Sequence, residues 1–146
     1  MKTFRIFKHT LAVLLLAFLS QQVIAKDTDD TLHEDIKSAA ETFEKAIDQR
    51  NFKVAKEQLD VLFPLMKKEF KEAKKQIHAF EKDADLVSAG LLQKSLDRKV
   101  EIHDQLHSLV EASSASLRVQ AEDAKALVLE YKELLEAKIQ LLSSLN

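Results

Sequence analysis

The chain has 146 residues, no cysteine, one glycine and one proline, and its formal net charge is −2. The length suits a single domain, and the absence of cysteine excludes disulfides and thiolate catalysis. The slightly acidic balance argues against nucleic-acid binding, which needs a basic face, and a single glycine excludes a glycine-rich phosphate loop.

The first 25 residues have the pattern of an export signal. Three basic residues and no acid precede the apolar run 11–19, which is too short to span a bilayer because spanning takes roughly 20 residues. Val23 and Ala25 supply the residues that a signal peptidase requires. We predict a cleaved signal peptide at 1–25, followed by one soluble helical domain at 26–146 with a net charge of −5. This pattern indicates a bacterial periplasmic protein without a stable membrane anchor.

The first helix is predicted at 32–49. Its apolar residues recur at spacings of three and four, which is typical of an amphipathic helix, and they are Leu32, Ile36, Ala39, Phe43 and Ala46. Thr31 and Glu34 have the spacing of a capping box at the helix N-terminus. His33 follows Leu32 and His78 follows Ile77, so both imidazoles are expected to face solvent.

The second helix is predicted at 52–81. The apolar stripe loses its phase between Ala46 and Phe52, and Asn51 is a good N-cap. Pro64 removes one backbone hydrogen bond from the helix interior. Because the stripe keeps its phase on both sides of Pro64, we expect a kink there and not an end.

The third and fourth helices are predicted at 85–112 and 116–144. Three serines within 111–117 weaken the helix, although the heptad phase continues from Val110 to Leu117. A turn in this segment gives an all-α, antiparallel, up-down-up-down four-helix bundle. The alternative is that the last two helices merge into one long coiled-coil rod.

The stretch "HDQLH" places His103 and His107 four residues apart, so both imidazoles share one helical face. The spacing is that of a zinc-binding helix, but zinc needs three or four ligands, and Asp104 stands where a metalloprotease has its catalytic glutamate. His103 and His107 are the only metal-site candidates. The competing interpretation is structural: His103 donates a hydrogen bond to the Asp60 carbonyl that Pro64 leaves unpaired, or to the Asp60 side chain.

Two further features are weaker. Met66 and His103 are the only pair at core-facing positions that could ligate haem. A group of lysines on the second helix, with Lys94 and Arg98 from the third helix nearby, could form a basic patch; Glu69 and Glu72 dilute it. These lysines are Lys67, Lys68, Lys71, Lys74 and Lys75.

The sequence contains no arrangement that predicts catalysis and none that predicts a cofactor. We therefore expect a periplasmic protein-interaction module, an adaptor, chaperone-like factor or accessory subunit. It would bind another periplasmic protein or itself through its amphipathic helices. The alternative is a metal- or haem-binding periplasmic four-helix bundle that uses His103 and His107.

Overall fold

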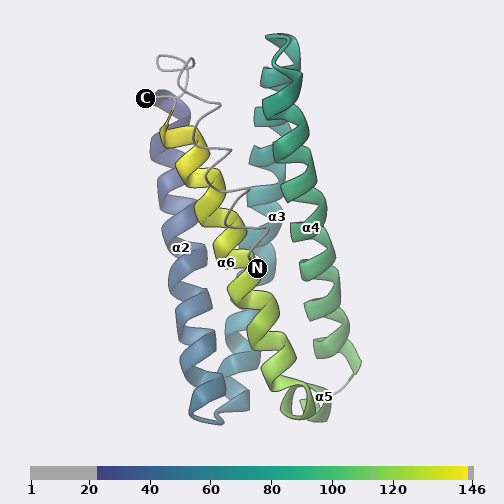
Figure 1. Cartoon of the computed structure of the whole chain (residues 1–146). Coiled ribbons are helices and arrows are strands. Elements are labelled where there is room, and N and C mark those ends of the chain that lie inside the picture. Colours follow the sequence, from purple (N-terminus) through teal and green to yellow (C-terminus); the bar gives the residue numbers. More distant parts are fainter. Residues whose placement is uncertain (1–22, 113, 145–146) are drawn as a thin grey trace.

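The computed structural model describes the backbone of residues 23–112 and 114–144, and the side chains of 31–112 and 115–144. Within these residues the chain forms five helices and no strand, and the helices pack against one another (Figure 1). The prediction of an all-helical chain is confirmed. Most of the predicted signal peptide, residues 1–22, lies outside the described residues. The helices are α2 (Val23–Asp48), α3 (Phe52–Lys82), α4 (Leu86–Ala112), α5 (Ser114–Val119) and α6 (Ala121–Ser143).

Helix α2 begins well before the predicted start. Its first residue is Val23, so Thr31 lies inside the helix and the predicted capping box is wrong. The physical reason is that no glycine or proline lies between Val23 and Thr31. Nothing in that segment interrupts the backbone hydrogen bonds of the helix.

The turn from α2 to α3 has the predicted cap. Asn51 is the N-cap of α3, and its side chain accepts a hydrogen bond of 3.3 Å from the Val54 amide. Arg50 adopts a left-handed backbone with φ 57°, which allows the Asn51 amide to donate to the Ala46 carbonyl at 2.8 Å. This return hydrogen bond is typical of a helix C-terminus that ends in a left-handed residue.

Helix α3 continues through Pro64, as the unbroken apolar stripe predicts. The proline is exposed, so its ring faces away from the core. After α3, Ala84 has a φ of 61° and Asp85 caps α4 by accepting from the Ser88 amide at 3.1 Å. The bounds of α3 and α4 therefore lie within one residue of the predicted ones.

The chain turns between α4 and α6. Arg98 on α4 and Glu130 on α6 form two parallel hydrogen bonds of 2.7 and 2.8 Å. One continuous helix would hold these residues about 48 Å apart, so the alternative of a single rod is wrong. The predicted helix at 116–144 is divided by Gln120 into α5 and α6. Buried Leu117 anchors α5 in the core.

The core has two apolar clusters. The larger one joins α2, α3, α4, α5 and α6 around Phe43, Leu59 and Met66, and the smaller one joins α3, α4 and α6 around Phe80, Leu92 and Leu141. Along each of the helices α3, α4 and α6, a buried charged residue lies where one cluster gives way to the other. These residues are Glu69, Lys99 and Lys138.

Candidate functional site

A fully buried ionic cluster is the most unusual feature of the core. Lys99 of α4 donates a hydrogen bond to Oε1 of Glu69 on α3, and Nζ of Lys138 on α6 lies 3.5 Å from the same oxygen. The side chains of these three residues are at most 1% exposed. His33 of α2 is 4% exposed and is close enough for its charge to interact with all three. Four helices thus contribute to one site, which we call the ionic cluster: His33, Glu69, Lys99 and Lys138.

The protonation of the ionic cluster follows from burial and mutual attraction. Burial would raise the pKa of Glu69, but the ammonium groups of Lys99 and Lys138 outweigh it and lower that pKa to about 2. Burial lowers the pKa of Lys99 to about 8, although Glu69 opposes the shift. Burial, with a smaller effect of Lys138, lowers the pKa of His33 to about 4. At neutral pH the cluster therefore holds an ionised Glu69, a largely protonated Lys99 and a neutral His33.

Several polar atoms in and beside the cluster lack a hydrogen-bond partner. They are both ring nitrogens of His33, Oε2 of Glu69, Nζ of Lys138 and the hydroxyl of Tyr131. Tyr131 is 1% exposed, and burial together with the charge of Glu69 raises its pKa. Buried polar atoms are nearly always paired with protein atoms or with ordered water. The cluster therefore holds buried donors and acceptors that no other side chain pairs.

Sequence reasoning missed this cluster. His33 was expected to face solvent and is buried, because it lies three residues before Ile36 and shares its face of α2. Glu69 was expected to dilute a surface patch, yet its side chain is 0% exposed. The exposed position of His78 is as predicted, with 72% of its side chain accessible.

The two histidines of HDQLH lie together on α4. Their rings stack with centroids 5.9 Å apart and an interplanar angle of 20°, and the ring of Phe63 lies 5.3 Å from His103 and 5.2 Å from His107. Nδ1 of His103 is 3.0 Å from Asp104, and Nδ1 of His107 is 3.3 Å from Glu111. Two imidazoles on one face satisfy only the first requirement of a metal site, and metal binding there stays the alternative hypothesis.

The predicted hydrogen bond from His103 to Asp60 is wrong. Nδ1 of His103 pairs with the carboxylate of Asp104, and its buried Nε2 has no partner. Asp104 is the next residue in the chain, so its carboxylate is the nearer acceptor. Met66, the other residue of the predicted haem-binding pair, is fully buried in the larger apolar cluster. The ring of Phe70 lies 5.8 Å from the ring of His103.

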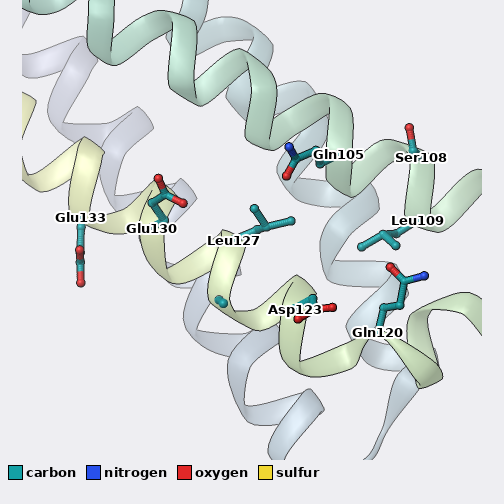
Figure 2. A pocket seen from close by; sticks show the side chains of 9 residues that line it. Gln105, Ser108, Leu109, Gln120, Asp123, Leu127, Glu130 and Glu133 are labelled. Atoms are coloured by element: carbon teal, nitrogen blue, oxygen red, sulfur yellow. The ribbon is translucent and has the colours of Figure 1, made fainter. Parts of the chain in front are cut away.

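A surface groove of about 730 Å³ runs between α4 and α6 (Figure 2). Leu109 of α4 and Leu127 of α6 face each other across it, and both also pack against the larger apolar cluster. Its other lining side chains are acidic, neutral polar or small, and none is basic. They are Gln105, Ser108, Gln120, Asp123, Ala126, Glu130 and Glu133.

The lysines of the predicted basic patch lie on the exposed face of α3. Lys67, Lys68, Lys71, Lys74 and Lys75 are all exposed, as is Lys94 on α4. Glu69 does not dilute them because it is buried, and Glu72 pairs with Lys75 at 3.4 Å. Arg98 is engaged by Glu101 and Glu130, so it adds little free charge to the patch.

Among the described residues, no group of three or more histidine, aspartate or glutamate side chains could hold a metal ion. No helix in the same part of the chain is long and apolar enough to cross a membrane. Comparison with protein-family models, with curated proteins and with solved structures found no match. The function therefore has to be argued from the side chains themselves.

Proposed function

We propose that this protein is exported to the periplasm through residues 1–25 and works there without catalysis as a protein-interaction module. The groove between α4 and α6 would receive a basic amphipathic helix of a partner protein. The observation that carries this proposal is the lining of the groove, which combines an apolar floor with acidic side chains and has no basic residue.

The proposal includes a specific bundle topology, an antiparallel four-helix bundle in which α5 forms part of the last turn. The packing of the four long helices supports this topology, because each of them has two long helices as neighbours. Helix α2 packs against α3 and α6, and α4 packs against the same two helices. In this arrangement α4 and α6 are neighbours that run in opposite directions, and their outer faces border the groove. Ser108 and Ala126 are the smallest side chains that line it.

The chemistry of the groove selects its occupant. Leu109 and Leu127 offer partly buried apolar surface that an apolar helix face can cover. Asp123 is exposed beside them and can pair with lysine or arginine at the edge of such a helix. Glu130 is already held by Arg98, and Glu133 extends away from the two leucines (Figure 2). Asp123 is therefore the acid best placed to contact the partner.

The length of the groove suits a short helix. Its α6 side runs from Asp123 to Glu133, which corresponds to about 15 Å of helix axis or nearly three turns. An amphipathic helix of three to four turns presents apolar residues at spacings of three, four and seven along one face. Such a segment could cover both leucines while its basic edge lies against Asp123.

The proposal can be tested with purified 26–146 protein and two fluorescent helical peptides that share leucines on one face. One peptide carries lysine at its polar positions and the other carries glutamate. We expect saturable fluorescence anisotropy with the lysine peptide and none with the glutamate peptide. The double variant Asp123→Lys/Leu127→Lys should lose at least ten-fold in affinity.

Glu41→Lys is the matched control, because it introduces a lysine at an exposed position on α2, away from the groove. It should bind like the unaltered protein. Equal binding of both peptides, or equal loss in Glu41→Lys and the groove variant, would refute docking in the groove. Sedimentation that detects a stable dimer disrupted by Asp123→Lys/Leu127→Lys would also overturn the proposal, since the occupant would then be a second copy of this chain.

A further inference from the structure

The ionic cluster carries an unbalanced charge. Among the side chains that the structure describes, Glu69 is the only buried carboxylate, whereas two lysines, Lys99 and Lys138, are buried. His33 is neutral at pH 7 because burial, with a smaller effect of Lys138, lowers its pKa to about 4. The cluster therefore has one positive charge in excess, enclosed within the core.

An excess charge in this position is unfavourable unless it is compensated. A single buried ion without a partner costs several kcal/mol even after local relaxation. Lys138 is the group left over: Nζ of Lys99 donates to Glu69, while Nζ of Lys138 lies 3.5 Å from the same oxygen and has no hydrogen-bond partner. Loss of a proton from Lys99 would remove the excess, but its pKa of about 8 leaves Lys99 mostly charged at neutral pH.

The unpaired atoms of the cluster include donors and acceptors. The Lys138 ammonium has protons without acceptors, the Tyr131 hydroxyl has a proton to donate, and neutral His33 carries one ring N–H. On the acceptor side, Glu69 Oε2, the second ring nitrogen of His33 and the Tyr131 hydroxyl oxygen are unpaired. A group that accepts hydrogen bonds and carries negative charge would pair with the Lys138 ammonium and offset the excess positive charge.

We propose that the ionic cluster binds one small monovalent anion of the halide class, with chloride as the physiological ligand, held by Lys138, Tyr131 and His33. A single negative charge neutralises the excess of one positive charge. Lys138 and Tyr131 are at most 2% exposed, which favours a small monovalent anion over a multiply charged one such as phosphate, because removing the larger charge from water costs more. A water molecule would accept the hydrogen bonds but would leave the charge uncompensated.

Chloride binding to the folded state raises the melting temperature with the concentration of free chloride. We would measure thermal unfolding of the 26–146 protein at pH 7 while chloride replaces gluconate at constant ionic strength. The expected result is a saturable rise of roughly 5 °C by about 0.1 M chloride. Lys138→Met should fold and lose this rise, because its unbranched side chain fills a similar volume without the charge.

Lys94→Met is the control, since Lys94 is exposed on α4 and outside the cluster; it should respond to chloride like the unaltered protein. A crystal grown in bromide should show an anomalous peak within hydrogen-bonding distance of Lys138, and this measurement decides the matter if Lys138→Met does not fold. Identical melting in chloride and gluconate would overturn the proposal. So would a chloride response that survives in Lys138→Met, or bromide bound only at the protein surface.

Discussion

Lys99 of α4 and Glu69 of α3 form an ion pair whose side chains are 1% and 0% exposed. The pair lies between the two apolar clusters and connects α3 and α4, which are consecutive helices joined by the turn at 83–85. Such a pair is weak evidence for stability, because desolvation opposes the Coulomb attraction. It does favour one register of α3 against α4, since a shift of either helix would leave a charge unpaired in apolar surroundings.

Removing the carboxylate of this pair should be strongly destabilising. Glu69→Leu leaves Lys99 and Lys138 without a buried anionic partner, and we expect a loss of about 3–5 kcal/mol in the free energy of unfolding. The triple variant Glu69→Leu/Lys99→Met/Lys138→Met should recover most of that loss, because apolar side chains of similar volume then fill the layer. Urea unfolding measures the free energy of unfolding of both variants. An equal loss in the single and triple variants would contradict this account.

Acid should destabilise the protein through His33. The pKa of His33 is about 4 in the folded chain and 6.5 in its unperturbed state, so the unfolded chain binds the proton first as pH falls. The contribution of neutral His33 to the free energy of unfolding is therefore fully present above pH 6.5. It is lost progressively as pH falls towards 4, and the loss is at most about 3 kcal/mol. His33→Gln should abolish the loss in this window.

His78→Gln serves as the control for that experiment, because His78 is largely exposed; its pH dependence should match that of the unaltered protein. Glu69 contributes in a separate window. The folded pKa of Glu69, about 2, lies below its ordinary value of 4.5, so the contribution of Glu69 to stability is lost only as pH falls from about 4.5 to 2. An unchanged loss between pH 6.5 and 4 in His33→Gln would show that another group is responsible.

Replacing Pro64 should stabilise the protein. Pro64 lies inside α3 and is exposed, and it deprives the Asp60 carbonyl of its helical donor at a cost of about 3 kcal/mol. Pro64→Ala restores the backbone donor. It also increases the conformational entropy of the unfolded chain, which offsets up to about 1 kcal/mol of the gain in stability. We expect a net gain of about 2 kcal/mol by thermal unfolding. Val61→Ala, at a half-exposed position on the same helix, should change stability by less than about 0.5 kcal/mol, and a similar gain in both variants would argue against the backbone explanation.

The helices were predictable because periodic apolar residues and local caps determine them. Asn51 and the segment at 83–85 specify the turns through hydrogen bonds within a few residues, so the bounds of α3 and α4 follow from the sequence. The start of α2 was not predictable from the capping signal at Thr31. A capping box stabilises a helix N-terminus but does not stop a helix that has no breaker before it.

The ionic cluster is not predictable from residue type, because glutamate and lysine side chains are almost never fully buried unless they are paired. Glu69 lies three residues after Met66 and four before Ala73, and Lys138 lies four after Leu134 and three before Leu141. Each occupies a position where the apolar stripe lacks an apolar residue, which is a signal of burial. Only the packing of α3 against α4 and of α4 against α6 shows that these gaps coincide, since helical periodicity does not define partners across helices.

His103 and His107 should not form a tight metal site by themselves. Their rings stack on one face of α4, but two imidazoles fall short of the three or four ligands that zinc needs, and the described residues offer no group of three or more suitable side chains. We expect calorimetric titration with zinc, copper and nickel to show no micromolar binding at one equivalent, and an absorbance scan to show no haem. The His103→Ala/His107→Ala double variant should give the same result as the unaltered protein. Tight binding that disappears in this variant would instead identify HDQLH as a metal site and favour metal handling over helix recognition as the function.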